Sequence, residues 1–419
     1  MRTPDSAKNV VIIGAGIVGV STAIWLQREG FQVTLIERES QAGEGASYGN
    51  AGLVSNSASY PMNVPGLLGK APGMVLDRSQ PLFLKWRYLP RLAPWLLQFL
   101  RGATPDTVGR TAQALHALLG DAVADHQALA AGTGAQKWVV KADYLVAYKD
   151  RAAFELDAEG WAMRKRMGFH WDELESVDFL QYDPVFSRDL RFAAKLPGHG
   201  RITDPGRYVK QLAAHVVANG GRLFQGEVGA IVVENGRVSG VRADGNLIEC
   251  DRVVVAAGAW SKTLMRGLGL RVPLESERGY HLEVWDPSFM PRTSTMITTG
   301  KFVMTPMEGR LRLAGIVEFG GLQAPPSRAP FELLRRHLRA TLPGLTWAHQ
   351  QEWMGHRPTL ADSVPMIGEV PGAKGVFLGF GHHHVGLTGG PKTGQLLAQL
   401  IAGKTPNIDM APYAPGRFS

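Results

Sequence analysis

Three glycines near the N-terminus have the spacing of a loop that binds a diphosphate. They are Gly14, Gly16 and Gly19 in the run Gly-Ala-Gly-Ile-Val-Gly. The first glycine permits a tight turn, the second lets the backbone approach a diphosphate, and the third lets a helix pack closely on a strand. The N-terminus of that helix offers unpaired N–H groups to the phosphates. Glu37 ends the next apolar run, where it can accept hydrogen bonds from ribose hydroxyls. The sequence therefore predicts a dinucleotide site.

The segment Gly45–Leu53 is made almost entirely of small residues. A solvent-exposed loop usually holds more charge, whereas small residues allow the backbone to lie against a flat, bulky ligand. We expect this segment to contact the same ligand as the glycine loop. The candidate contacts are Ser47, Asn50, Ala51, Gly52 and Leu53.

Three consecutive histidines, His382–His384, suggest a metal site at first sight. Adjacent side chains of an extended segment point to opposite sides, so three in a row cannot all face one ion. Neither a cysteine nor a His-x-x-x-His pattern lies nearby. We therefore expect no metal site in this chain.

The elements that position these residues follow from hydrophobic periodicity. Val10–Ile13 predicts a buried strand, the residues after Gly19 a helix that ends at Gly30, and Gln32–Ile36 a second strand. The pattern resumes with a helix after Asp204-Pro205 and the strand Val253–Val255, and it ends with a helix that reaches Ile401. We also expect helices over 111–131 and 150–167, and a strand over 222–233 followed by a hairpin turn at Asn235-Gly236. We predict an α/β fold with a discontinuous nucleotide unit, residues 1–60, 198–272 and 350–419, interleaved with an α+β unit, residues 61–197 and 273–349.

Composition narrows the class of protein. The chain has 419 residues with 50 glycines, 45% hydrophobic residues and a formal charge of +8. This charge suits anionic substrates or a phosphate-bearing cofactor. Because no dense basic run carries interleaved aromatics, we expect no nucleic-acid partner. The uncharged stretch 10–26 is short for a membrane span and contains the glycine loop, so we expect a cytoplasmic protein.

Taken together, the motifs resemble the D-amino-acid dehydrogenase branch of the glutathione-reductase-like, FAD-dependent oxidoreductases. D-amino-acid oxidase, glycine oxidase and sarcosine oxidase belong to the same superfamily. The resemblance spans the chain and rests on Gly14–Gly19, Glu37-Arg38, Ala46–Leu53, Val254–Trp260, Gly355–Pro358, Pro365–Gly368 and Gly379–Thr388. It implies an FAD-binding, Rossmann-like unit, with the second unit built on a mostly antiparallel sheet. It also implies noncovalent FAD, since the single cysteine, Cys250, precedes a predicted core strand.

The resemblance also implies roles for individual residues. Arg357 matches the position that binds a substrate carboxylate, and a guanidinium suits that bidentate contact. Tyr280 resembles a tyrosine near the substrate, with a half-buried strand aromatic as the competing interpretation. One of His383 and His384 faces the flavin or the substrate, with His384 as the candidate that assists deprotonation of the amino group. The resemblance also implies contacts to FAD beyond the glycine loop and Glu37. These are Ala15, Ile17, Val18, Arg38, Val228, Ala257, Gly258, Trp260, Gly381, Gly386, Leu387 and Thr388.

The expected reaction is hydride transfer from Cα of an amino acid, most simply a D-amino acid, to FAD. The loop around Ser47 resembles the dehydrogenase branch, which implies an acceptor other than oxygen, such as a membrane quinone. Pro81–Arg101 combines aromatics with Lys and Arg, as in-plane membrane anchors do. The competing interpretation is a core helix broken by Pro90 and Pro94. Two alternatives for the function stay open. One is an oxidase or dehydrogenase of a secondary amine or cyclic amino acid of the sarcosine, glycine or hydroxyproline type, and the other is an FAD subunit of a larger electron-transfer complex.

Overall fold

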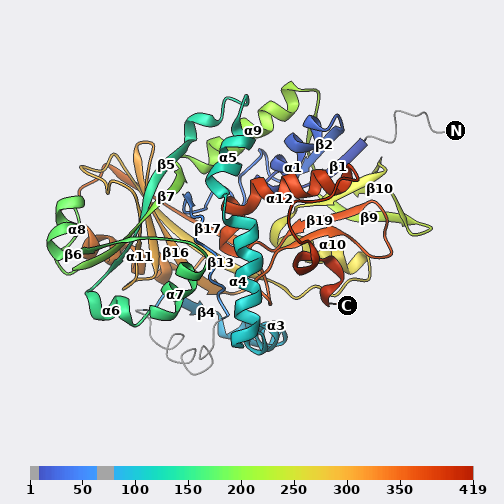
Figure 1. The fold of residues 1–419 in the computed structure, drawn as a ribbon. Helices are drawn as coiled ribbons and strands as arrows, with labels where there is room; N and C mark the ends of the chain where they lie inside the picture. The colour runs from blue at the N-terminus through green and yellow to red at the C-terminus, as the bar shows by residue number, and fades with distance from the viewer. Residues whose placement is uncertain (1–8, 64–79, 419) are drawn as a thin grey trace.

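The computed structural model describes residues 9–63 and 80–418. Its strands form two large sheets and a separate three-stranded sheet. Figure 1 shows the two large sheets as neighbouring lobes. The six-stranded sheet, which contains β1, β2 and β19, lies on the side of the chain termini. Residues 64–79 of the apolar segment expected in the second unit lie outside the described residues.

The six-stranded sheet is the predicted nucleotide-binding core. Its order is β18-β19-β12-β1-β2-β8, parallel except for the edge strand β18. The β-branched run of β1 is buried on both faces, as expected for a central parallel strand. The strands are β1 (Asn9–Ile13), β2 (Gln32–Glu37), β8 (Arg222–Gln225), β12 (Arg252–Val255), β18 (Met366–Glu369) and β19 (Val376–Phe380).

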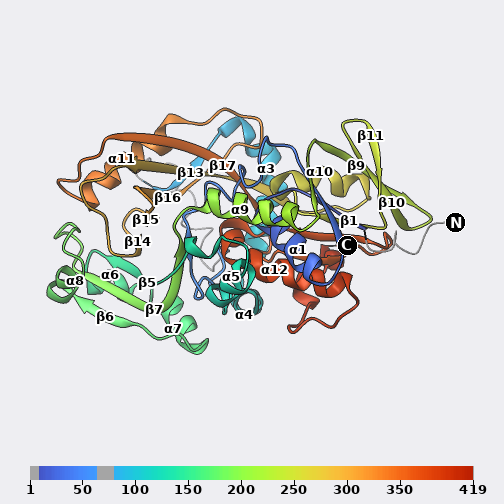
Figure 2. The same cartoon turned by 90° about the horizontal axis from the view of Figure 1, so that it is seen from above.

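Two helices begin at the carboxyl ends of central strands in this sheet. These are α1 (Ile17–Arg28), which follows β1, and α12 (Gly386–Ile401), which follows β19. They pack so closely that a Cβ added to Gly394 would lie 2.6 Å from Cβ of Ser21. Figure 2 shows α1 and α12 beside each other. Both N-termini therefore face the edge of the sheet where a ligand of an α/β fold binds.

The larger sheet has ten strands and is mostly antiparallel, which confirms the predicted fold class. It curls, so that β13 and β17 lie on one side of the lobe and β5 and β7 on the other (Figure 2). Its strands are β3 (Leu53–Val54), β4 (Leu82–Leu84), β5 (Val139–Tyr148), β6 (Asp172–Glu175), β7 (Phe192–Ile202), β13 (Leu274–Trp285), β14 (Ser294–Ile297), β15 (Phe302–Met307), β16 (Arg310–Phe319) and β17 (His349–Leu360). Thus β3, β17 and the end of β7 pair in this sheet although the sequence prediction placed them with the nucleotide unit; the division into two units stays a prediction.

Three sequence predictions of long elements are corrected by the structure. The single strand expected over 222–233 is two strands in different sheets, β8 and β9 (Val228–Glu234), which separate at Gly226. The helix expected over 111–131 is α4 (Pro105–Leu119) and α5 (Ala122–Ala130), and that expected over 150–167 is α6 (Arg151–Glu155) and α7 (Ala158–Arg166). The predicted hairpin is present between β9 and β10 (Arg237–Ala243), with β11 (Asn246–Glu249) beside β10. The other helices are α8 (Ser176–Tyr182), α9 (Pro205–Ala218), α10 (Ser261–Gly267) and α11 (Arg328–Thr341).

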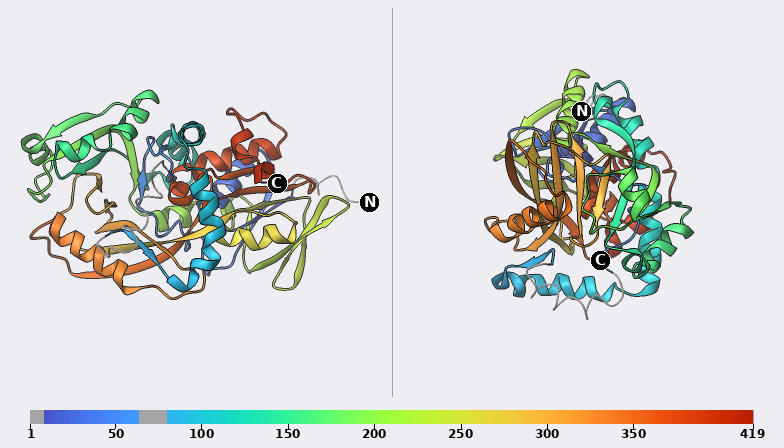
Figure 3. Two further views of the ribbon diagram at one scale, coloured as in Figure 1. Left: turned by 90° about the horizontal axis from the view of Figure 1, so that it is seen from below. Right: turned by 90° about the vertical axis from the view of Figure 1, so that its left-hand side faces the viewer.

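The apolar segment with two prolines forms one helix, α3 (Leu89–Arg101), and is not broken. Pro90 occupies its first turn, where no N–H is required, and the helix continues through Pro94. One face is core: Leu92, Trp95 and Phe99 are buried. Figure 3 shows α3 at the edge of the molecule. No helix in the described part of the chain is long and apolar enough to span a bilayer.

Candidate active site

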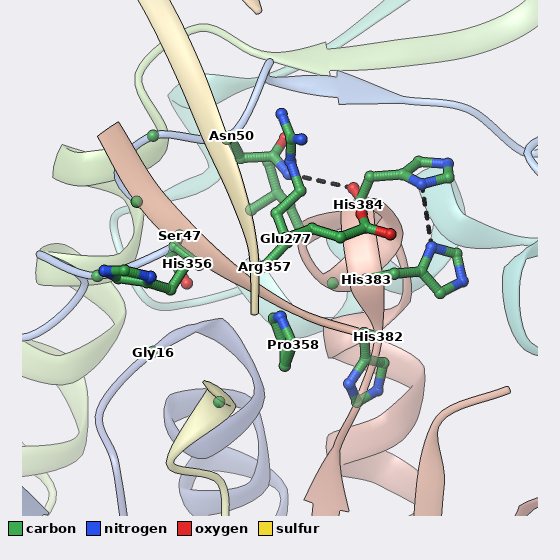
Figure 4. A pocket seen from close by; sticks show the side chains of 18 of the residues that line it. Gly16, Ser47, Asn50, Glu277, His356, Arg357, Pro358, His382, His383 and His384 are labelled. Atoms are coloured by element: carbon green, nitrogen blue, oxygen red, sulfur yellow. Dashed lines mark hydrogen bonds between the residues drawn. The ribbon is translucent and has the colours of Figure 1, made fainter. Parts of the chain in front are cut away.

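A cavity of about 880 Å³ lies where the two large sheets meet, and residues of both sheets line it. The structure brings most of the predicted site residues to this cavity, and Figure 4 shows several of them. Those that line it are Gly14, Gly16, Ile17, Val18, Glu37, Arg38, Ser47, Asn50, Ala51, Leu53, Val228, Ala257, Gly258, Trp260, Arg357, His384, Gly386, Leu387 and Thr388.

The glycine loop has the geometry that its motif predicts. Gly14 has φ of +102°, and a Cβ there would lie 2.5 Å from the carbonyl oxygen of Ala256. A Cβ on Gly19 would lie 1.9 Å from the carbonyl oxygen of Gly14. The N-cap residue of α1, Gly16, has no side chain that could cap the helix, although Ser47 from outside the helix accepts a hydrogen bond from its first N–H, that of Ile17. This helix end is therefore open toward the cavity, as a diphosphate site requires.

Glu37 holds the loop from the end of β2. Its Oε2 accepts a hydrogen bond of 2.7 Å from the backbone N–H of Ala15, and its Oε1 accepts one of 3.1 Å from that of Glu39. Each carboxylate oxygen can accept a further hydrogen bond. Glu37 can thus hold ribose hydroxyls and the glycine loop at once.

The small-residue segment is fixed from both lobes. Ser47 Oγ accepts a hydrogen bond of 3.0 Å from the N–H of Ile17, and Asn50 Nδ2 donates one of 3.4 Å to the carbonyl of His384. From β16, Arg312 donates to the carbonyls of Tyr48 at 2.7 Å and Asn50 at 2.5 Å. Arg312 and its partner Glu283 are both 0% exposed, and their N–O distance is 2.6 Å. A buried ion pair of the larger sheet therefore holds the loop that borders the nucleotide site.

Aromatic groups border the cavity beyond the end of β2. The guanidinium of Arg38 lies 3.5 Å from the ring centroid of Trp260, and the ring of His356 meets Trp260 edge-on at 5.3 Å. Burial lowers the pKa of His356 to about 4, so this ring is neutral near pH 7. These flat groups fit a ring system rather than a small ion.

At the opposite end, α12 begins beside the loop. No side chain caps its N-terminus, and Thr388 Oγ1 donates to the carbonyl of Leu53 at 3.3 Å. His126 Nε2 donates a hydrogen bond of 2.9 Å to the carbonyl of Leu387. The positive end of this helix dipole can stabilise negative charge on a bound ring system.

Arg357 and Glu277 stand directly opposite each other on β17 and β13. Arg357 Nη1 donates to the carbonyl of Ile316 at 3.2 Å. Gly279 makes room for this side chain, because a Cβ there would lie 2.5 Å from its Cζ. Burial lowers the pKa of Arg357, and the nearby Glu277 opposes that shift. The cavity thus holds a guanidinium for which no carboxylate within ion-pair distance is found among the described residues.

The three histidines make different contacts. His382 Nε2 donates to Thr393 Oγ1 at 2.8 Å, because that hydroxyl gives its own proton to Gly389. His383 has φ of +40°, and its Nε2 lies 3.1 Å from the carbonyl of Ser363. Its Nδ1 lies 3.0 Å from Nδ1 of His384; a dashed line marks this contact in Figure 4. No group of three or more possible metal ligands is found among residues 9–63 and 80–418.

Four predicted site residues do not line the cavity: Ala15, Gly52, Gly381 and Tyr280. Tyr280 donates its hydroxyl proton to Glu318 Oε2 at 2.6 Å and packs on Phe331 of α11. The reason is strand alternation: Gly279 faces the cavity, so the next residue points to the other face. Tyr280 therefore takes the position of a buried strand aromatic.

Sequence reasoning missed Glu277 and Trp353. Both line the cavity, and Trp353 packs so tightly on Gly49 that a Cβ there would lie 1.7 Å from its ring. Two-residue periodicity was the available signal, since Glu277 shares a strand face with Gly279, as Trp353 does with Gly355 and Arg357. This periodicity identifies which residues share a face of the strand, but not whether that face borders the cavity.

Comparison with known proteins places this arrangement among flavoenzymes. Residues 9–400 match the family model described as "DAO: FAD dependent oxidoreductase". A D-amino-acid oxidase of Bradyrhizobium diazoefficiens is 40% identical over 98% of this chain and 99% of the relative. A D-amino acid dehydrogenase 2 of Pseudomonas aeruginosa is 33% identical, covering 98% of each chain. The structure of glycine oxidase from Geobacillus kaustophilus superposes with a TM-score of 0.75 at 22% identity, covering 97% of this chain and 98% of that one.

Proposed function

The chain belongs to the DAO family of FAD-dependent oxidoreductases. We propose that it oxidises the Cα–N bond of an amino acid, with a D-amino acid as the preferred substrate. When bound, FAD supplies the electron acceptor that takes the hydride from Cα. The imino acid so formed hydrolyses in water to a 2-oxo acid and ammonia. The names of the two curated relatives, which refer to D-amino acids, support this choice of substrate.

The observation that carries the proposal is the placement of Arg357. Its guanidinium shares one cavity with the glycine loop, and no acidic side chain of the described residues lies within 4.0 Å of it. A planar guanidinium binds a carboxylate with two parallel hydrogen bonds, which fixes the orientation of the substrate. Arg357 would hold the α-carboxylate so that Cα faces the flavin.

The chain's own groups suit FAD. The N-terminus of α1 would take the diphosphate, Glu37 the ribose hydroxyls and the N-terminus of α12 the flavin ring. Cys250 is buried among apolar residues that include Val253 and does not line the cavity. We therefore propose that the FAD is noncovalently bound.

His384 presents a hydrogen-bond acceptor to the cavity. Because a carbonyl only accepts, His383 Nε2 must carry the proton that it gives to Ser363. Burial lowers the pKa of His383 to about 4, so this ring is neutral and its Nδ1 accepts a hydrogen bond from Nδ1–H of His384. The Nε2 of His384 then carries a lone pair. This nitrogen would accept a hydrogen bond from the substrate or from water in the site.

The proposal extends to the electron acceptor that reoxidises the flavin. We infer an acceptor other than oxygen, at a membrane surface that the outer face of α3 and the segment just before it contact. Trp86 is 59% exposed and Leu97 is 56% exposed, with the cations Arg87, Arg91 and Arg101 on the same segment. Aromatic, aliphatic and cationic side chains together favour an anionic membrane surface.

A substrate panel tests the function. The purified protein, loaded with FAD, is given D- and L-amino acids, glycine, sarcosine and hydroxyproline under two regimes, dye reduction without oxygen and oxygen consumption in air. We expect dye reduction with D-amino acids, with the 2-oxo acid and ammonia as products. Turnover of secondary amines alone would contradict the proposed substrate, and rapid oxygen consumption would contradict the proposed acceptor.

A further inference from the structure

The carboxyl group of Glu277 borders the cavity, and its Oε2 lacks a hydrogen-bond partner among the described residues. Glu277 is 2% exposed, and this Oε2 is buried. No Lys, Arg or His nitrogen of those residues lies within 4.0 Å of it. Burying an unpaired carboxylate costs free energy, which a bound cation would offset. The site therefore favours a ligand with a positive charge beside Arg357.

The carboxylate of Glu277 and the guanidinium of Arg357 are placed so that they could bind the two charges of a zwitterion. Glu277 and Arg357 are directly opposite in the antiparallel pair of β13 and β17, so both side chains start on one face of the sheet. Figure 4 shows them diverging from there, with the carboxyl group of Glu277 on the side of His383 and His384. An α-amino acid carries its carboxylate and its ammonium on the same carbon, so neighbouring groups of opposite charge can hold both.

We propose that Glu277 binds the α-ammonium group of the substrate and accepts its proton before the hydride leaves Cα. The inference rests on the proposed function. One proton passes from the nitrogen to a carboxylate oxygen of Glu277, and the lone pair left on nitrogen forms the C=N bond as the hydride goes to FAD. The sum is a two-electron oxidation of the amine and a two-electron reduction of the flavin.

The groups around Glu277 set its proton affinity. Burial raises the pKa of Glu277 to about 7, while Arg357 and the hydroxyl of Thr359 on β17 lower it and Glu275 on its own strand raises it. On β16 the opposite residue is the uncharged Phe319. His383 and His384, which follow β19, are neutral because burial lowers the pKa of each well below its usual value. Glu277, not His384, can therefore hold a proton near neutral pH.

The test compares Glu277→Gln with Glu275→Gln as the matched control. Glu275 lies two residues earlier on the same strand, is bound by the hydroxyl of Tyr88 and does not line the cavity. Binding to the FAD-loaded protein is measured by calorimetry with 2-aminoisobutyrate, which lacks a Cα hydrogen, and with isobutyrate, which lacks the amine. We expect Glu277→Gln to weaken 2-aminoisobutyrate about tenfold or more and isobutyrate less than about twofold. Glu275→Gln should change each affinity by less than about twofold, because Glu275 makes the smallest of the named contributions to the pKa of Glu277.

The pH profile gives the second measurement. In the wild type, kcat/KM should rise through about pH 7 as Glu277 loses its proton, and this limb should be absent in Glu277→Gln. Should that variant not fold, Glu277→Asp keeps the limb and lowers kcat. Equal loss of affinity for both analogues, or a limb that persists in Glu277→Gln, would overturn the proposal. A wild type that oxidises no amino acid contradicts the proposed function instead, and the analogue pair still decides the role of Glu277 because it needs binding alone.

Discussion

The guanidinium of Arg357 is the group that we expect to bind the α-carboxylate of the substrate. Arg357→Met should retain FAD, because Arg357 lies outside the glycine loop, and should lower kcat/KM by the equivalent of about 2–5 kcal/mol. Arg357→Lys should recover only part of this loss, since an ammonium cannot form two parallel hydrogen bonds. Steady-state kinetics with the best substrate gives the measurement, with His349→Gln, at the exposed end of the same strand, as control. Unchanged kcat/KM in both Arg357 variants would remove this residue from the site.

Between β1 and α1, the glycine loop leaves room for a diphosphate. A Cβ on Gly16 would meet only Ser47 Oγ, at 3.3 Å, so a small shift of the Ser47 side chain would admit a side chain there. The branched side chain of Gly16→Val would instead occupy the phosphate path, and we expect a folded protein that has lost its flavin. The ratio of visible to ultraviolet absorbance measures bound FAD, and circular dichroism checks the fold. Gly109→Val, in α4 away from the cavity, is the control; stoichiometric FAD in Gly16→Val would refute the assignment of this loop.

Strand β16 holds the small-residue loop through Arg312. Removing this guanidinium leaves Glu283 buried beside Arg310 alone and deprives two loop carbonyls of their donor. Arg312→Met should lower the free energy of unfolding by about 3–5 kcal/mol and weaken FAD binding. The exposed pair of Arg335 and Glu352 offers the contrast, since Arg335→Met should cost about 1 kcal/mol or less. Denaturant unfolding and FAD titration of the two variants test this difference, and equal values would show that Arg312 does not fix the loop.

For the molecule as a whole, the exposed face of α3 and the segment before it are the candidate contact with a membrane. Cosedimentation with anionic liposomes should occur at low salt and decline at high salt, because the cations contribute by screened attraction. Trp86→Ser with Leu97→Ser should abolish it. Trp95 is unsuitable for this test, because it is 4% exposed and its indole donates to the carbonyl of Thr359. Leu156→Ser, at an 89% exposed site elsewhere, serves as control. No binding, together with rapid hydrogen peroxide formation in air, would indicate an oxidase without a membrane partner.

The sequence by itself determined the parts of the protein whose signals are local. The glycine loop, Glu37 and the strands around them lie within about thirty residues, so the turn, the helix and the acid could be predicted from spacing. Arg357 and the segment before α12 could be inferred from resemblance. The prediction that prolines break the helix over Leu89–Arg101 was wrong. The free energy gained by burying Leu92, Trp95 and Phe99 outweighs the hydrogen bond lost at Pro94.

Only the tertiary structure decided which distant residues meet. The register of β13 against β17 places Glu277 opposite Arg357 and turns Tyr280 away, and a shift by one residue would reverse both results. The pairing of β16 with β13 likewise brings Arg312 beneath the loop at Tyr48. No local pattern encodes such contacts, because sheet order and register follow from how the whole chain buries its apolar faces.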